Sequence, residues 1–440
     1  LIEELKSKSS EELNSKKSLA IKLSKDILAE PETGYKEFKT NKKIYETLKS
    51  LNMEIVNNLA ITGLKTTIKG SKPGPHIAVI GELDGLPVPG HPFEDKNSHA
   101  AHACGHHIQV GNMLATLIAL NTDEILSNLS GSISFIAVPS EEYVEIEWRN
   151  EQRDQGKFEF LGGKQELVKL GVFDDVDISM MTHARGSFSG FGYGGTGNGL
   201  VAKFIEFHGK SSHAGGDPHL GINALNAANL AITNIHANRE TFFDDHHIRV
   251  HPIITHGGSV VNQVPEIVTL ETFVRGASLE AIKNANLKVD NCLRAGAMAV
   301  GAEVKITTLP GYFPLFHDTK LQDIYKNNLN EFENKSTELS YGGGSTDMGD
   351  LAHLMPVIHP YVGGATDASA HTAGFVVEDY DLAVVEAGRM MAFTIIDLLH
   401  EDASKAKEVL SNFKPRLSKA EYLKVMREFS NVEIANYNIG

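Results

Sequence analysis

The stretch Ile77-Ala78-Val79-Ile80-Gly81, which leads directly into Glu82-Leu83-Asp84, decides the fold class. A short, unbroken apolar run of this kind is typical of a strand buried on both faces, as the central strands of α/β sheets are. The runs Leu64–Ile68, Ile133–Val138 and Ile178–Met181 have the same character. Helical spacing of apolar residues predicts helices over 9–28, 37–51, 110–119, 321–333, 382–399 and 418–429. The chain is therefore predicted to be an α/β protein.

Candidate metal ligands follow these predicted strands. The segment His102-Ala103-Cys104-Gly105-His106-His107 places a thiol and several imidazoles within six residues, and zinc and similar ions bind both groups readily. Glu141-Glu142 and His183 each come shortly after a strand, and His371 follows a Gly-Gly turn. Because open α/β sheets place their sites at the carboxyl ends of the strands, these side chains predict a metal-dependent hydrolase.

Each candidate also has a plain structural alternative. Cys104 could be a buried core cysteine, and Glu141-Glu142 could be a solvated acidic turn. A single histidine such as His183 or His371 is more often a hydrogen-bonded residue than a ligand. Asp84 could hold a ligating imidazole from behind or simply form a turn, and spacing alone favours neither. The density of imidazoles around Cys104 is what favours a metal site.

Composition narrows the possible partners. The chain has 440 residues, of which 41% are hydrophobic and 22% charged, as in ordinary soluble globular proteins of two or more domains. The net charge of -15 argues against nucleic acid or an anionic membrane as a partner, and no apolar run approaches the ~20 residues that cross a bilayer. Two cysteines and a charged first segment without an apolar core, although it begins with Leu rather than Met, favour the cytoplasm. A small-molecule substrate is expected.

The pattern changes after Gly190–Gly199, which is predicted to be a flexible connection. Beyond it we expect strands over 201–207, 248–255, 267–275 and 303–308, and helices over 221–237 and 278–300. The order β-α-β-β-α-β is that of a ferredoxin-like domain. Pro310 and Pro314 mark the return to the first domain. The predicted division is thus a first domain of residues 1–198 and 312–440, interrupted by an inserted domain at 199–311.

Taken together, these motifs resemble those of the M20 family of metallopeptidases and amidohydrolases, over nearly the whole chain. HACGHH at 102–107 resembles the HACGHD segment of the amidohydrolase branch, and Pro139-Ser140-Glu141-Glu142 resembles its P-x-E-E. The remaining matches are Pro31-Glu32-Thr33-Gly34 with Glu37, Glu82-Leu83-Asp84-Gly85-Leu86-Pro87, Ser212-His213-Ala214, Gly257–Asn262, Gly344–Asp347 and Ala370-His371-Thr372. The last two look most like the p-aminobenzoyl-glutamate hydrolase and PM20D2-like branch.

The resemblance implies a zinc-peptidase-like catalytic domain, with a mixed sheet covered by helices on both faces, and a ferredoxin-like lid that offers a homodimer surface. It implies two divalent metal ions, zinc or manganese, held by Cys104, His106, Glu142, His183 and His371. Glu141 would be the general base, and Asp84 would support a ligand from behind. His213 would polarise the scissile carbonyl, often in the neighbouring subunit. The residues implied to contact the substrate's carbonyl or carboxylate are Asn262 and Arg275.

The chain departs from the family pattern in several places. Glu82 replaces the first Asp of the D-x-D motif, His107 stands where Asp is usual, and Gln109 stands where a further His is common. About forty residues separate Glu142 from His183, and Trp148–Gly163 looks inserted. This segment could shape the pocket or the dimer.

The implied activity is hydrolysis of the amide bond of N-acyl or N-aroyl amino acids, including aminobenzoyl-glutamate-like compounds, by a metal-activated water. Lid closure is expected to accompany binding, with Gly190–Gly199 as one hinge strand. A metallo-dipeptidase or aminopeptidase, which would require a free α-amine on its substrate, is the nearest alternative. A metal-binding protein without activity is a further alternative, and the presence of both Glu141 and Glu142 argues against it.

Overall fold

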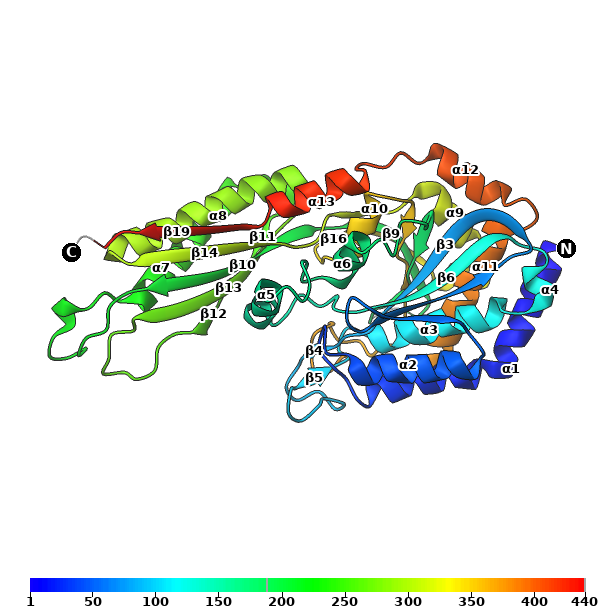
Figure 1. Ribbon diagram of the computed structural model, residues 1–440, viewed down its shortest axis with the longest axis horizontal. Helices are drawn as coiled ribbons and strands as arrows, with labels where there is room; N and C mark the ends of the chain where they lie inside the picture. The colour runs from blue at the N-terminus through cyan, green and yellow to red at the C-terminus, as the bar shows by residue number, and fades with distance from the viewer. Residues whose placement is uncertain (187–188, 439–440) are drawn as a thin grey trace.

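The computed structural model describes residues 1–186 and 189–438, and the molecule is elongated, with a larger α/β region at one end and a second sheet with two long helices at the other (Figure 1). Among the described residues, no helix is long and apolar enough to cross a membrane. Both cysteines are free and buried.

The larger region is built on a six-stranded mixed sheet with the strand order β1-β2-β6-β3-β7-β17. The last four strands of this order run parallel, whereas β1 and β2 pair antiparallel. The strands, in sheet order, are Ile55–Leu59, Gly63–Lys69, Ser130–Val138, Lys72–Glu82, Ile178–Met180 and Val357–Ile358. The predicted mixed sheet is confirmed.

Strand β3 is buried on both faces, as its sequence predicts. Ile77 and Val79 join the hydrophobic core beneath helices α1, α3 and α11, whereas Ala78 and Ile80 join the core on the opposite face, with α6 and α10. Helices therefore cover both faces of the sheet (Figure 1). The bounds of these five helices are Ile2–Leu28, His106–Leu120, Ala387–Leu399, Gly163–Lys169 and Met348–Ala352.

The second sheet has the order β11-β13-β10-β14-β19, and β12 also pairs with β13. Helices α7 and α8 pack side by side against it (Figure 1). From residue 199 to residue 310 the strands and α-helices follow the order β-α-β-β-β-α-β. Their bounds are Gly199–His208 (β10), Ala224–Ala237 (α7), Arg249–Val250 (β11), Ile253–His256 (β12), Ile267–Gly276 (β13), Leu279–Val300 (α8) and Glu303–Pro310 (β14).

The single strand expected over 248–255 is two short strands, because Pro252 between them has no N–H to donate to the ladder. A further difference is β19 (Asn431–Asn436), which comes from the end of the chain and pairs antiparallel with β14. Residues 312–440 were predicted to belong to the first domain, and this strand was not expected.

The prediction that Gly190–Gly199 is a flexible connection is wrong. Residues Phe191–Gly197 form strand β9, which pairs with β15, β16 and β18. The glycines allow backbones to approach closely, since a Cβ at Gly195 would lie 2.6 Å from the Ser340 carbonyl oxygen. This third sheet also includes β8, and its other strands are His183–Ala184 (β8), Leu315–Phe316 (β15), Thr337–Gly342 (β16) and Tyr361–Val362 (β18).

The first helix also begins earlier than its sequence pattern predicts. It was expected over 9–28, but α1 begins at Ile2 and Ser9 is buried within it. Beyond the helices already given, the chain forms α2 (Phe38–Ser50), α4 (Asp123–Leu126), α5 (Ile146–Asp154) and α9 (Thr319–Asn327). Short 3-10 or π turns cover Pro218–Leu220, Arg239–Thr241, Asp244–His246, Asn330–Lys335 and Asp381–Glu386, and β4 (Leu86–Pro87) pairs with β5 (Ala100–Ala101).

The end of the chain contacts both regions. Helix α12 (Ser404–Asn412) is followed by α13 (Lys419–Glu428), whose capping box between Ser418 and Glu421 agrees with the predicted helix over 418–429. The Tyr422 hydroxyl of α13 donates to the buried Asp350 carboxylate at 2.8 Å. In β19, Glu433 accepts from Arg294 of α8 at 2.7 Å. The final segment thus bridges the two sheets.

We predict that Gly163→Ala destabilises the fold. A Cβ at Gly163 would overlap the carbonyl oxygen of Pro139, so the turn after β6 and the start of α6 would have to move apart. Overpacking of this kind typically costs about 1–3 kcal/mol, which thermal or urea unfolding would measure. Gly344→Ala is the control, because its Cβ would meet open space. Equal stability of the two variants would contradict the prediction.

Candidate active site

A cavity of about 980 Å³ opens where the parallel strands of the first sheet end, and four of the predicted metal ligands line it: Cys104, Glu142, His183 and His371. Glu141 lines it too, and His106 lies buried beside them. The side chains come from α3 and the loop before it, from the turn after β6, from β8, and from the loop after β18. Segments far apart in the sequence therefore meet at one edge of the sheet.

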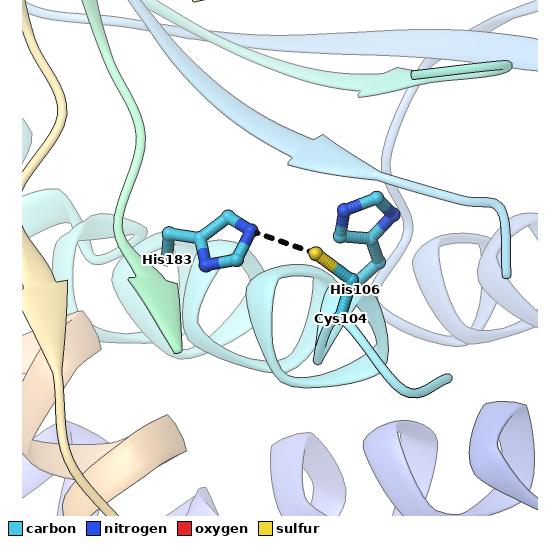
Figure 2. A group of neighbouring side chains, drawn as sticks. All are labelled: Cys104, His106 and His183. Atoms are coloured by element: carbon cyan, nitrogen blue, oxygen red, sulfur yellow. Dashed lines mark hydrogen bonds between the residues drawn. The ribbon is translucent and has the colours of Figure 1, made fainter. Parts of the chain in front are cut away.

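The side chains form two overlapping groups that share Cys104. Its Sγ lies 3.5 Å from His183 Nε2, with His106 beside it (Figure 2). On the other side, the same Sγ lies 3.3 Å from His371 Nε2, and that nitrogen lies 3.2 Å from Glu142 Oε1. Within each group the ligand atoms all lie within 4.8 Å of one another.

These separations fit divalent metal ions. Two nitrogen or oxygen ligands about 2.1 Å from one ion lie about 3.0–3.4 Å apart, and a thiolate at about 2.3 Å lies about 3.1–3.6 Å from such a ligand. The distances from Cys104 to His183 and His371, and from His371 to Glu142, fall in these ranges. The donor set of thiol, imidazole and carboxylate suits zinc, and its carboxylates and imidazoles also suit manganese. The residues therefore fit a pair of ions that share Cys104.

Asp84 connects three of the segments that carry these groups. Its backbone carbonyl accepts a hydrogen bond from His106 Nδ1 at 2.7 Å, which leaves Nε2 of that ring for a metal. Its carboxylate accepts from the backbone N–H of Glu142 at 2.8 Å. Asp84 itself is fully buried and belongs to neither ligand group. It therefore orients two candidate ligands without being one.

The turn that presents Glu141 and Glu142 is held from behind by Glu37. Ser140 has a positive φ of 56°, which is strained for a residue with a side chain. Its N–H donates to Glu37 Oε1 at 2.8 Å, and the Thr62 hydroxyl donates to Glu37 Oε2 at 2.6 Å. Gly34 is required nearby, because a Cβ there would lie 2.7 Å from the Ser140 hydroxyl. These contacts account for Gly34 and Glu37 in the motif near the start of the chain.

The pKa values of Glu141 and Glu142 are shifted in opposite directions. Burial raises the pKa of Glu141 well above its usual range, and the nearby Glu82 and Glu142 carboxylates raise it further. Burial also opposes ionisation of Glu142, but His371 overcomes this and lowers the Glu142 pKa to about 2. Glu142 in turn raises the His371 pKa to about 11. Glu142 is thus suited to bind a cation, and Glu141 to hold and release a proton.

The Cys104 thiol is prepared for ionisation. Burial and the Glu142 carboxylate both act to raise its pKa, but His183 and His106 outweigh them and lower it to about 6. A thiolate, not a thiol, is the form that binds metal. The lowered pKa therefore favours the metal-binding form of the sulfur that both ligand groups share.

The residues that the resemblance implies to act on the substrate lie in two separate parts of the structure. Arg275, on β13, lines the cavity and donates to the Ser345 hydroxyl at 2.7 Å. His213 and Asn262 are exposed on loops of the second sheet, and neither is among the described residues that line the cavity. Their loops contact each other, since the Ala214 N–H donates to the Asn262 carbonyl. Within one chain, the structure does not bring these two residues to the metal ligands.

Sequence reasoning missed several residues at the site. Glu82, Lys164 and Asp347 form a fully buried ion-pair network behind Glu141. His359 lines the cavity, is fully buried, and has no hydrogen-bond partner among the described residues at either ring nitrogen. Its position directly after the apolar strand Val357–Ile358 was a usable signal, whereas nothing in the local sequence marks Lys164. No residue of Trp148–Gly163 is among those described as lining the cavity.

We predict that Cys104→Ala removes most of the bound metal, because this thiol belongs to both groups. His183→Ala should remove about one ion, since His183 belongs to one group only. Metal content of protein purified without chelator, measured by mass spectrometry, would test this. Cys292→Ala is the control, because the other free cysteine lies in α8, away from the cavity. Retention of two ions by Cys104→Ala would contradict the prediction.

Known proteins share this architecture. The model of peptidase family M20/M25/M40 matches residues 78–396. The Xaa-Arg dipeptidase of Mus musculus is 27% identical over 358 residues, which cover 79% of this chain and 75% of the relative. The N-acyl-L-amino acid amidohydrolase of Geobacillus stearothermophilus is 30% identical over 215 residues, covering 47% of this chain and 53% of the relative. A solved structure of the Bacillus subtilis YXEP protein, described as a dinuclear metal binding peptidase, has a TM-score of 0.64 at 21% identity and covers 88% of this chain and 99% of its own. Since the family model spans well over half of the sequence, the chain belongs to the M20/M25/M40 peptidase family and is a metal-dependent hydrolase.

Proposed function

We propose that the protein is a two-metal amidohydrolase that cleaves the amide bond of N-acyl or N-aroyl amino acids, aminobenzoyl-glutamate-like compounds among them. The observation that carries this proposal is the pair of ligand groups that share Cys104 on the wall of a cavity that Arg275 also lines. The groups supply a site for hydrolysis, and the guanidinium supplies a partner for the free carboxylate of an acyl amino acid. We assign the ligands as Cys104, His106, Glu142, His183 and His371, with zinc or manganese as the ions.

The residues of the chain divide the work of amide hydrolysis. Bound divalent ions would lower the pKa of a water molecule from ~15.7 towards ~7 and polarise the amide carbonyl. Glu141 would accept a proton from the attacking water and return it to the nitrogen of the leaving amine. Burial raises the pKa of Glu141, which makes its carboxylate a stronger base than a solvated one. Asp84 holds His106 and the Glu142 backbone in place throughout.

A metallo-dipeptidase is the second candidate, and the similarity to an Xaa-Arg dipeptidase favours it. The two activities differ in what they require at the amino end of the substrate. A dipeptidase or aminopeptidase needs a free α-amine, whereas an amidohydrolase accepts an acyl group there. Assays on dipeptides paired with their N-acetylated forms would separate them. Cleavage of the free dipeptides alone would replace our proposal with the dipeptidase.

We further propose a cytoplasmic homodimer. His213 would then act on the site of the neighbouring subunit, which is consistent with its exposure in this chain. The strand β12 lies at the edge of its sheet and exposes Ile253 and Ile254, as an edge that pairs with another chain would. Two free cysteines are consistent with a reducing compartment.

We predict that Glu141→Gln lowers kcat by about 10²–10⁴-fold while metal content stays at the wild-type level. The amide cannot accept the proton of the attacking water, and general-base catalysis typically contributes a rate factor of about 10²–10⁴. Metal content should stay unchanged because Glu141 is in neither of the groups that share Cys104. Steady-state kinetics together with metal analysis would measure both. Glu147→Gln, an exposed carboxylate in the same segment, is the control. Unchanged turnover in Glu141→Gln would remove Glu141 from the mechanism.

We predict that Arg275→Met raises KM for acyl amino acids by about 10–100-fold, because a hydrogen bond to a charged group contributes about 1.5–3 kcal/mol. Substrates whose carboxylate is replaced by a carboxamide should lose much less. Arg249→Met is a matched control, since Arg249 is the cross-strand partner of Arg275 on β11 but is exposed and not among the residues that line the cavity. An equal loss for both substrate types would contradict a role in carboxylate binding.

A further inference from the structure

Two of the residues that depart from the family pattern contact each other. Gln109 Nε2 donates to Glu82 Oε2 at 2.9 Å, and the Glu82 N–H donates to Gln109 Oε1 at 3.1 Å. Lys164, which comes directly after the segment that looks inserted, forms an ion pair with the other oxygen of Glu82. All three side chains are fully buried. Gln109, Glu82 and Lys164, which are far apart in the sequence, thus form a single buried network.

This network orients the Glu82 carboxylate towards the candidate metal ligands. Glu82 Oε2 lies 3.1 Å from His106 Nε2, the ring nitrogen that Asp84 leaves free. That separation falls in the range expected for two ligands of one ion. Glu141 Oε2 lies 3.6 Å from the same nitrogen, and the ligand atoms of Glu82, His106 and Glu141 lie within 4.8 Å of one another. Apart from the salt contacts to the two glutamates, His106 Nε2 has no hydrogen-bond partner within the described residues.

Lys164 is fixed from the opposite side, so it can hold Glu82 in this orientation. Its ammonium group forms an ion pair with Asp347 as well as with Glu82, and its backbone N–H donates to Asp347 Oδ2 at 3.2 Å. Asp347 is fully buried just before α10. With Oε1 of Glu82 bound by Lys164, only Oε2 is directed towards His106.

We propose that Glu82 is a further carboxylate ligand of the metal ion that His106 holds, and that Lys164 is the residue that positions it. This inference rests on the two-metal function proposed above. It adds an oxygen ligand beside His106, which Glu82 and Glu141 approach in a group of their own, so that one ion of the pair has a more oxygen-rich environment than thiolate and imidazole ligands alone provide. Oxygen ligands favour harder ions such as manganese.

Glu82→Gln tests the ligand. We expect the affinity for one of the two ions to fall at least 10-fold, with a larger loss for Mn²⁺ than for Zn²⁺, measured by titrating metal-free protein with each ion. With Co²⁺, the visible absorption of one ion should change. Glu82→Asp, which keeps the charge but withdraws the oxygen by one methylene group, should weaken the same ion. Wild-type affinities and spectra in both variants would overturn the proposal.

Lys164→Met tests the positioning role, and Lys203→Met is its matched control. Lys203 is equally buried, in β10, where it pairs with Asp290 at 2.6 Å. Both variants lose a buried ion pair and should lose stability, but only Lys164→Met should weaken one ion at least 10-fold and change the Co²⁺ spectrum. Lys164→Arg should recover part of that affinity. Equal metal binding in the Lys164 and Lys203 variants would overturn the role of Lys164.

The proposed function and the role of Glu82 can be contradicted separately. If the wild-type protein binds no divalent metal, the proposed function is wrong. If it binds two ions and Glu82→Gln binds them equally well, the function stands and only the role of Glu82 is wrong.

Discussion

The site depends on the way Asp84 links the ends of three segments at one edge of the sheet. Asp84 directly follows β3. It accepts a hydrogen bond from Nδ1 of His106, at the start of α3, and another from the backbone N–H of Glu142, after β6. Because β3 and β6 are parallel neighbours, their carboxyl ends lie together, and Asp84 between them can fix the His106 ring through its backbone carbonyl and the Glu142 backbone through its carboxylate. The His371 loop then docks on the same place, since its N–H donates to the Ala103 carbonyl.

That arrangement concentrates negative charge where water is excluded, which is costly unless cations compensate. Lys164 compensates Glu82 and Asp347. For the rest of the cluster, imidazoles act as the cations: burial opposes protonation of His106 and His183, but Glu82 and Cys104 respectively overcome it and raise their pKa values, and Glu142 raises that of His371. Protons on these rings therefore compete with metal for the same nitrogens. Because the pKa of each ring is raised, metal affinity rises with pH as the protons leave.

Local pattern was enough to predict much of this architecture. The double-sided burial of β3 follows from the continuous apolar run Ile77–Gly81, and the ligand candidates follow from residues placed after such runs. What local pattern cannot show is pairing between distant segments. The glycines of 190–199 are as compatible with a loop as with a strand, and only the neighbouring strands decide between them. Local pattern cannot identify Lys164 either, because its partners Glu82 and Asp347 are 82 and 183 residues away in the sequence.

The final segment of the chain limits how the two sheets can move relative to each other. Strand β19 extends the second sheet through β14, while Tyr422 of α13 is buried against Asp350 beside the first sheet. A large rotation between the sheets would have to break the β14–β19 ladder or remove Tyr422 from its pocket, and either change exposes buried groups. Strand β9, which pairs with three neighbours in place of the expected hinge, adds to this restraint. Closure over a substrate would then have to come from movements smaller than a rotation of the whole second sheet.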